Sequence, residues 1–232
     1  SEGVGHVHSL GADVNFLKEG DKVSYVTPVG AYAEYALINA AHAVEIKVDV
    51  DDHDVVASTL KGLTTHYLLH LTFKLESGMT AVVHAAAGGV GQIFAQWANS
   101  IGAKVIGTVG SDEKINLAKK YGCDEEINYN KENFKDKVLQ LTNNKGLPVV
   151  YDGVGKNTLE NSLGCLEMRG TMVSFGNASG KLDPVDVGKL IAPKGLYLTR
   201  PSIAHYTSTR EELDEASNKL FEMVKSGSVK VE

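Results

Sequence analysis

Two patterns of hydrophobic and polar residues follow one another along the chain. Residues 1–48 contain short runs rich in β-branched and aromatic residues, KVSYV at 22–26 and AYAEYALI at 31–38, separated by turns that contain glycine. From residue 80 onward, short apolar runs alternate with segments in which apolar residues recur every three or four positions. The chain is therefore predicted to begin with a β-rich part and to continue with alternating strands and helices.

The alternating part predicts a parallel sheet covered by helices on both faces. Apolar runs with few polar interruptions are typical of strands that are buried on both sides. The predicted strands are 80–85, 104–109, 125–129, 148–154, 171–176 and 196–200, and the helices between the first five are 90–101, 112–121, 132–142 and 157–167. Two further helices are predicted, over 54–72 with a possible break at Gly62 and from a Thr209 N-cap to Gly227. The last residues, 229–232, resemble the start of a strand.

A cluster of small residues follows the first strand of the alternating part. Residues 86–91, AAGGVG, match the dinucleotide-binding pattern G-x-G-x-x-G with alanine in the first place. Gly88 lets a pyrophosphate approach the backbone, Gly91 lets the helix pack closely on the sheet, and the helix N-terminus offers free N–H groups. Because the cluster lies between a predicted strand and a predicted helix, it indicates a nucleotide site rather than a simple turn.

The end of the next strand distinguishes between the two nicotinamide cofactors. Chains that bind NADH usually place Asp or Glu roughly 20 residues after the glycine motif, where it binds the ribose 2′-hydroxyl. Here the strand ends in Gly110-Ser111, and Lys114 lies one helical turn further, within reach of a 2′-phosphate. Asp112 and Glu113 leave an alternative open, since either carboxylate could turn toward a ribose instead of complementing the helix N-terminus. The pattern favours NADPH.

Composition and charge exclude several classes of protein. The 232-residue chain has a formal net charge of −6, which gives no general attraction to nucleic acids or anionic membranes. No apolar run reaches the roughly 20 residues of a membrane-spanning helix, and no secretory signal is visible. Cys123 and Cys165 have no neighbouring cysteine, as is typical of reduced thiols in cytosolic proteins. These features predict a cytoplasmic protein that does not bind membranes.

Several motifs in a fixed order resemble one family. They are LKGLTTHYLL at 60–69, HAAAGGVGQ at 84–92, GTVGSDEK at 107–114, INY at 127–129, VYDGVG at 150–155, VSFGNASG at 173–180 and LTRP at 198–201. Together they resemble the zeta-crystallin-like NADPH:quinone oxidoreductases of the medium-chain dehydrogenase/reductase superfamily. The resemblance implies an α/β fold, in which a Rossmann doubly wound parallel sheet adjoins part of a GroES-like β-rich catalytic domain. It implies a partial catalytic domain at 1–50, an NADPH-binding domain at 51–228 and a return to the catalytic domain at 229–232, in a chain truncated at both ends.

The resemblance also implies a role for individual residues. Thr64 would contact the nicotinamide side, and Tyr129 would flank the adenosine. Gly88, Gly89 and Val90, with Gly91 of the same motif, would line the pyrophosphate. Ser111 and Lys114 would hold the 2′-phosphate. Phe175, Gly176 and Asn177 would lie along the nicotinamide. Arg200 would contact the cofactor or organise a subunit interface. Gly153 stands where the family often has serine, so no hydrogen bond to the cofactor is carried over to that position.

Zinc is not expected, although the superfamily also contains zinc alcohol dehydrogenases. Ser1 and Lys61 occupy the positions matched to zinc ligands, and neither is a usual ligand. The resemblance therefore implies a zinc-independent, NADPH-dependent reductase of quinones or related conjugated carbonyls, which forms a homodimer near LYLTR at 196–200. No catalytic residue is assigned. Two alternatives stay open: an enoyl-thioester reductase of the same fold, and a non-catalytic, NADPH-regulated AU-rich RNA-binding or crystallin-like protein, although the acidity disfavours strong RNA binding.

Three further polar residues lie in predicted strands. His84 lies in an apolar strand and is interpreted as a hydrogen-bonded core residue. Tyr151 and Asp152 follow an apolar run, and both a turn at the end of the sheet and a catalytic role are compatible with them.

Overall fold

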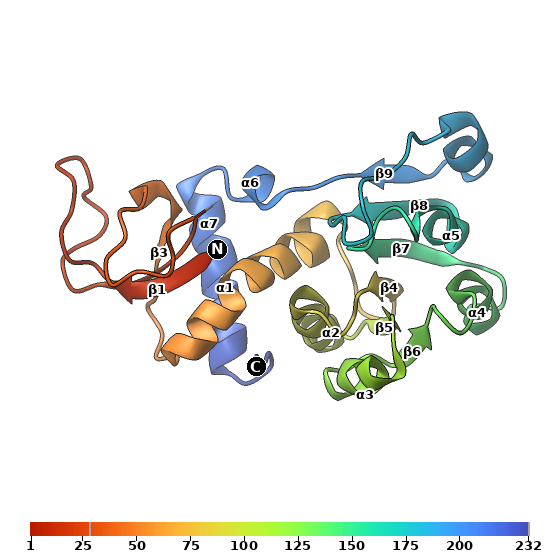
Figure 1. Ribbon diagram of the computed structural model, residues 1–232, viewed down its shortest axis with the longest axis horizontal. Helices are drawn as coiled ribbons and strands as arrows, with labels where there is room; N and C mark the ends of the chain where they lie inside the picture. Colours follow the sequence, from red (N-terminus) through yellow and green to blue (C-terminus); the bar gives the residue numbers. More distant parts are fainter. Residues whose placement is uncertain (28, 232) are drawn as a thin grey trace. The chain divides into compact units, whose positions relative to one another are not determined.

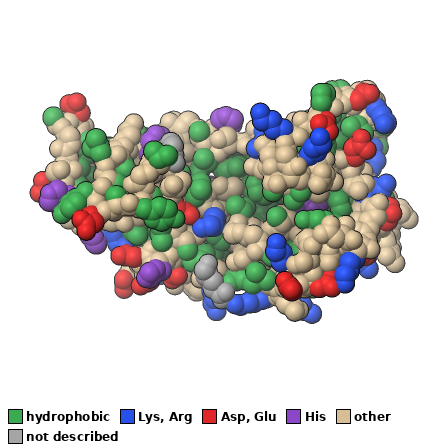
Figure 2. All heavy atoms as spheres, viewed as in Figure 1, with side chains coloured by type: hydrophobic (Ala, Val, Ile, Leu, Met, Phe, Trp, Pro, Cys, Tyr) green, Lys and Arg blue, Asp and Glu red, His purple; other side chains and the backbone are tan. Residues whose placement is uncertain are grey.

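The structure is a computed structural model that describes residues 1–27 and 29–231, and the chain forms two compact units (Figure 1). The first unit consists of residues 1–67 and 203–232, and the second of residues 68–202. Within the described residues, no helix combines the length and the hydrophobicity that crossing a bilayer requires. On the face shown in Figure 2, positive and negative side chains are interspersed. The domain boundaries predicted near residues 50 and 228 stay a prediction.

A small antiparallel sheet and two long helices form the first unit. The strands β1 (Glu2–His6), β2 (Lys22–Val26) and β3 (Ala43–Glu45) pair in the order β1-β2-β3. Helix α1 (Asp52–Tyr67) packs against α7 (Arg210–Lys225) and the short α6 (Ile203–Tyr206). Gly62 does not break α1. A Cβ at Gly62 would lie 2.2 Å from Cδ1 of Leu220, so the glycine allows α7 to approach closely.

Two predictions for the first unit are wrong. Residues 31–38 form no strand, residues 32–35 are bends, and the side chains of Tyr32, Tyr35 and Leu37 are exposed. A strand needs a neighbouring strand for its backbone hydrogen bonds, and the described sheet contains β1, β2 and β3 only. Residues 229–231 likewise form no strand, while Glu232 lies outside the described residues. The N-cap at Thr209 is confirmed, with Glu212 completing a capping box.

A parallel sheet of six strands forms the centre of the second unit. Its strands are β4 (Thr80–His84), β5 (Lys104–Val109), β6 (Glu125–Asn128), β7 (Leu147–Asp152), β8 (Leu166–Ser174) and β9 (Tyr197–Thr199). They lie in the order β6-β5-β4-β7-β8-β9, and every neighbouring pair is parallel. This is the strand order of the doubly wound dinucleotide-binding fold, and it reverses direction between β4 and β7.

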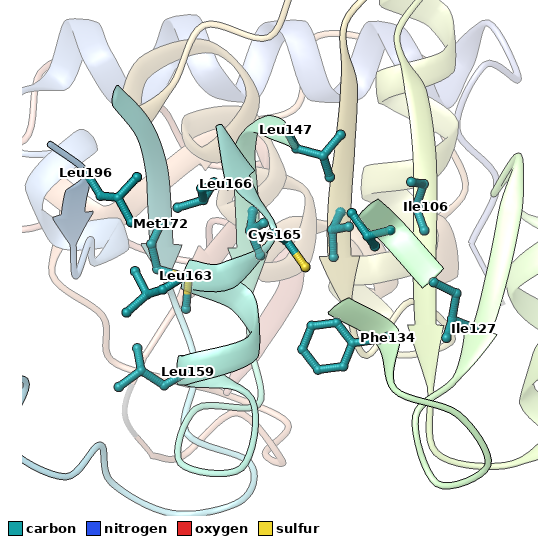
Figure 3. Packing of buried hydrophobic residues seen from close by; sticks show 13 residues of the cluster. Ile106, Ile127, Phe134, Leu147, Leu159, Leu163, Cys165, Leu166, Met172 and Leu196 are labelled. Atoms are coloured by element: carbon teal, nitrogen blue, oxygen red, sulfur yellow. The ribbon is translucent and has the colours of Figure 1, made fainter. Parts of the chain in front are cut away.

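Helices cover both faces of this sheet. The helices are α2 (Gly89–Ile101), α3 (Asp112–Lys120), α4 (Phe134–Leu141) and α5 (Leu159–Gly164), and the shorter helical segments of this unit are η2 (Leu68–Thr72), η3 (Val187–Ile191) and η4 (Ala192–Lys194). Segment η1 (Ala40–His42) belongs to the first unit. On one face, Phe94 of α2 meets the ring of Tyr151 edge to face, with centroids 4.7 Å apart. On the opposite face, Phe134 of α4 and Leu163 of α5 belong to a buried cluster that includes Val150 (Figure 3). Consecutive residues of β7 thus serve two different cores, because strand side chains alternate between faces.

Candidate functional site

The loops after the parallel strands carry most of the predicted site residues. The glycine motif follows β4, Ser111 and Lys114 follow β5, Tyr129 follows β6, residues 175–177 follow β8, and Arg200 follows β9. The carboxyl ends of parallel strands lie along one edge of a sheet, and doubly wound folds bind ligands there, at the point where the strand order reverses. Thr64 lies on α1 in the first unit, and its contact with the nicotinamide stays a prediction.

The glycine motif forms an open helix N-terminus. Helix α2 begins at Gly89, with Gly88 as an N-cap that makes no side-chain hydrogen bond to the helix. Gly88 and Gly89 are exposed, whereas Gly91 is buried, and a Cβ at Gly91 would lie only 2.6 Å from the Ala85 carbonyl oxygen and the Ala86 Cα. Uncapped N–H groups at the positive end of a helix suit an anion such as a pyrophosphate.

A cavity of about 710 Å³ brings Lys114 and Tyr129 together. The Tyr129 hydroxyl lies against Gly110, where a Cβ would be 2.7 Å from the phenolic oxygen. Ser111 is the N-cap of α3, and its side chain makes no hydrogen bond to that helix. A cationic side chain and an uncommitted hydroxyl beside a helix N-terminus fit a phosphate group chemically.

Several residues that line this cavity were missed from the sequence. They are Asn130, Lys131, Glu132, Asn133, Phe134, Val154, Asn157, Thr158, Asn161, Ala178 and Ser179, together with Ala85. Many of them lie in the loops that follow β6 and β7 or at the start of the next helix. A search of each predicted strand end for polar residues would have found them, because loops after parallel strands converge at one edge.

Residues of β6 and of the loop after it hold the side chain of Asp112. Asp112 is one of the two carboxylates that could have turned toward a ribose. Its Oδ1 accepts a hydrogen bond from Asn128 Nδ2 at 2.8 Å, and its Oδ2 pairs with the ammonium group of Lys131. Hydrogen bonds from Lys131 and then from Asn128 lower the pKa of the Asp112 carboxyl below its usual value. Glu113 is exposed. The structure thus gives Asp112 two protein partners.

The loop after β8 is held against the loop after β7. The N–H groups of Phe175 and Gly176 both donate to the Asp152 carbonyl oxygen, at 2.9 and 3.3 Å. A Cβ at Gly176 would lie 2.3 Å from the Gly153 carbonyl oxygen, and a Cβ at Gly153 would lie 3.0 Å from Cζ of Phe175. The absence of a side chain at Gly153, noted from the sequence, therefore leaves room for the Phe175 ring.

A second cavity, of about 310 Å³, lies beside the same loop. Asn177 and Arg200 line it together with Ser174, and Arg200 Nη1 donates to the Ser174 carbonyl oxygen at 2.8 Å. The Ser174 hydroxyl is buried and has no hydrogen-bond partner among the described residues. Buried hydroxyl groups normally have a partner, so this one is an exception beside the cavity.

A fully buried polar network joins the ends of three strands. His84 of β4 lies 2.6 Å from the Thr108 hydroxyl at Nδ1 and 2.8 Å from the Ser162 hydroxyl at Nε2. Ser162 and Thr158 both donate to Asp152 Oδ2, while Oδ1 accepts the N–H groups of Val154 and Gly155. Because the Ser162 proton goes to the carboxylate, the network assigns the imidazole proton to Nε2. The interpretation of His84 as a hydrogen-bonded core residue is confirmed, and Asp152 holds the turn after β7.

The residues at the matched zinc positions do not fit a zinc ion. Lys61 Nζ lies 2.9 Å from Glu2 Oε1, and the N–H of Leu60 donates to Glu2 Oε2 at 2.6 Å. The partner of this carboxylate is thus an ammonium group, which cannot share a site with a metal cation without strong repulsion. Among the described residues, no three His, Cys, Asp or Glu side chains are grouped so that they could hold a metal ion.

Comparisons with known proteins identify the family. Residues 89–222, more than half of the chain, match the family model described as zinc-binding dehydrogenase. The chain is 45% identical to the quinone oxidoreductase of Pseudomonas aeruginosa, over 100% of this chain and 72% of that protein. The crystal structure of Escherichia coli quinone oxidoreductase complexed with NADPH is similar with a TM-score of 0.96 and 45% identity, over 100% of this chain and 71% of that one. A 2-haloacrylate reductase of a Burkholderia species is 42% identical, over 95% of this chain and 68% of that protein.

These similarities agree with the strand order and the glycine motif, and they confirm the predicted fold class and the predicted resemblance. The chain therefore belongs to the zinc-binding dehydrogenase family, and within it to the quinone oxidoreductases of the medium-chain dehydrogenase/reductase superfamily.

Proposed function

We propose that this protein is an NADPH-dependent oxidoreductase that reduces quinones or related conjugated carbonyls without zinc. The observation that carries the proposal is the grouping of Lys114, Tyr129 and the open N-terminus of α2 along one sheet edge. Its support from relatives is the name of the 45% identical proteins and the NADPH in the E. coli crystal structure. The N-terminus of α2 would bind the pyrophosphate of the cofactor, and Lys114 would bind its 2′-phosphate.

The protein groups bind and orient the cofactor and the acceptor. The N–H groups of Gly89, Val90 and Gly91 face the pyrophosphate, Ser111 and Lys114 hold the 2′-phosphate, and Tyr129 flanks the adenosine. Phe175, Gly176 and Asn177 lie along the nicotinamide, and Arg200 orders the neighbouring strand end through its bond to Ser174. When bound, NADPH supplies the reducing equivalents for the acceptor. The chain's own contribution is to hold the reactants and to keep water out.

Calorimetric titrations of NADPH and NADH into the full chain test the assignment of the cofactor. NADPH is expected to bind more tightly than NADH. Lys114→Ala is expected to weaken the binding of NADPH by about tenfold and to leave the binding of NADH nearly unchanged, because hydrogen bonds to charged groups contribute roughly 1.5–3 kcal/mol. Lys119→Ala is the matched control, since Lys119 is an exposed lysine in the last turn of the same helix. Equal binding of the two cofactors would contradict the roles of Ser111 and Lys114.

Steady-state oxidation of NADPH with different acceptors tests the reaction. Turnover of a quinone supports the proposal as stated. The 42% identity to a 2-haloacrylate reductase makes a conjugated acid the second acceptor to assay, and an enoyl thioester is the third. Reduction of the enoyl thioester without any quinone turnover would replace the proposal with the enoyl-thioester reductase alternative.

A non-catalytic RNA-binding role is the remaining alternative. Acidic and basic side chains are both present on the face shown in Figure 2, and the net charge is −6. Both features disfavour phosphate-backbone binding. A gel shift with AU-rich RNA at low salt, with and without NADPH, decides between the roles; an RNA complex that NADPH dissociates, without turnover of any acceptor, would favour the alternative. A cytoplasmic location and a homodimer belong to the same proposal.

A further inference from the structure

The loops after β5 and β6 are joined by several hydrogen bonds beside the proposed 2′-phosphate position. The N–H of Tyr129 donates to the Val109 carbonyl oxygen at 3.1 Å, and Asn130 Nδ2 donates to the Gly110 carbonyl oxygen at 2.7 Å. Asn128 is only 5% exposed, and its amide donates to Asp112 while its Oδ1 accepts the N–H of Asn130. A buried amide therefore sets the orientation of the Asp112 carboxylate.

Two lysines and the Asp112 carboxylate lie at this junction. Asp112 is the first residue of α3, directly after Ser111, and its negative charge would repel a phosphate held by Ser111 and Lys114. A carboxylate without a partner there could instead accept a hydrogen bond from a ribose 2′-hydroxyl, which is how NADH is usually selected. Lys131 pairs with this carboxylate, and Lys114 and Lys131 both line the cavity. The described cavity wall thus carries the ammonium groups of Lys114 and Lys131 together with the carboxylate of Glu132, and Lys131 also pairs with Asp112.

We propose that Lys131 is a specificity-determining residue, which selects NADPH over NADH by occupying the carboxylate of Asp112. The inference rests on the proposed function, because it assigns a role at the same cofactor site. Lys131 acts through Asp112 and not as the main ligand of the phosphate, which remains Lys114. With Lys131 in place, the Asp112 carboxylate is paired, so its charge repels a phosphate less and it is not free to accept a hydrogen bond from a ribose hydroxyl.

A double-mutant cycle separates this role from direct phosphate binding. The measured quantity is the ratio of the NADH Kd to the NADPH Kd for the full chain and for Lys131→Met, Asp112→Asn and the double variant. Lys131→Met is expected to lower the ratio by about tenfold, as the loss of one charge-assisted interaction would. Asp112→Asn alone is expected to keep or raise the ratio. In the double variant the ratio returns to within about threefold of the original value, because no carboxylate is left to neutralise.

The side chains of Lys131 and Asp112 are 66% and 56% exposed, so the variants should keep the urea midpoint of unfolding of the parent chain. Lys145→Met is the matched control, since Lys145 also forms an exposed ion pair, with Glu167 at 3.5 Å, but does not line the cavity. If Lys131→Met leaves the ratio of the two Kd values unchanged, the inference is overturned. It is also overturned if Lys131→Met lowers the ratio and the added Asp112→Asn does not restore it. That second result would make Lys131 a direct phosphate ligand. Absence of NADPH binding by the parent chain would overturn the proposed function together with the inference.

Discussion

Three glycines of the site illustrate how one missing side chain serves different purposes. At Gly91 the space for a Cβ is taken by backbone atoms of Ala85 and Ala86, which cannot move without disturbing the motif itself. At Gly110 the space is taken by the end of the Tyr129 side chain, which can rotate away. The first glycine therefore supports the fold, whereas the second determines where a cavity-lining aromatic ring lies. Gly153 makes room for the Phe175 ring in the same way.

At Gly110, an added methyl group should change binding more than stability. Gly110→Ala is expected to displace the Tyr129 ring and to weaken the binding of NADPH by about three- to tenfold. The free energy of unfolding is expected to fall by less than about 1 kcal/mol. Titration calorimetry and urea unfolding measure the two effects. Gly5→Ala is the control, because a Cβ at Gly5 has no neighbour within 4 Å. A large loss of stability with unchanged affinity for NADPH would show that the Tyr129 ring does not depend on this glycine.

At the scale of secondary-structure elements, the network around His84 and Asp152 connects the carboxyl ends of β4, β5 and β7 with α5. A hydroxyl from β5 and another from α5 hold the two imidazole nitrogens, and α5 and the turn after β7 supply the donors to the carboxylate. Every one of these side chains is buried. Fully satisfied buried networks are rigid, so the strand ends from which the loops of the site begin are held firmly together.

The same network makes stability depend on pH. Burial lowers the pKa of His84 below its usual 6.5, and the neighbouring Asp152 opposes this shift only in part. Below about pH 6.5 the unfolded chain binds a proton at His84 that the folded chain does not, so this contribution to stability is present above that pH and is lost as the pH falls. Between about pH 7.5 and pH 5.5, a single proton taken up only by the unfolded chain can lower the stability by at most about 1.4 kcal/mol.

Urea unfolding at the two pH values tests this expectation. Other groups also titrate over the range, so the comparison is with His84→Gln, which keeps a donor and an acceptor but cannot be protonated. The variant is expected to be less stable at both pH values and to lose less stability than the parent chain on acidification. The same acid dependence in both proteins would mean that His84 titrates alike in the folded and unfolded chains.

Helices and strands were predicted well where they depend on residues close in sequence. They were predicted less well where they depend on pairing with a strand that is distant in sequence. The strand at 104–109 has the predicted bounds, and α2 begins one residue before the predicted 90. Strand β8 begins at Leu166, where a helix end was predicted. It is irregular, since Arg169 has a positive φ of 61° and the register with β7 shifts between Leu147 and Val149. Neither the irregular register nor the failure of 31–38 to pair can be read from residues close in sequence.

At the scale of the whole molecule, the parallel sheet ends at β9. Its strand pairs with β8 on one side and forms the edge of the described sheet on the other. Tyr197 is 62% exposed and Leu198 is 37% exposed. An exposed edge strand with apolar side chains invites pairing with another chain, which agrees with the homodimer proposed near this strand.

The edge strand predicts how the oligomeric state responds to substitution. The chain is expected to elute as a dimer in size-exclusion chromatography with light scattering, and Leu198→Lys is expected to shift it toward the monomer, because like charges would face one another across a symmetric contact. Leu141→Lys is a matched control with the same 37% exposure, at the end of α4. A monomeric parent chain, or a dimer that Leu198→Lys leaves intact, would exclude β9 as the interface.

By itself the sequence determined the alternation of strands and helices, the glycine motif with its open helix N-terminus and the cationic residue after β5. These features depend on spacing within a few residues, and the apolar period and the preferences of glycine act over that range. Only the tertiary structure decided that Lys131 binds Asp112, that Tyr129 covers Gly110, and that His84 reaches Ser162. The partners in each of these contacts come from different loops or elements, and loops meet only once parallel strands are placed side by side in a particular order.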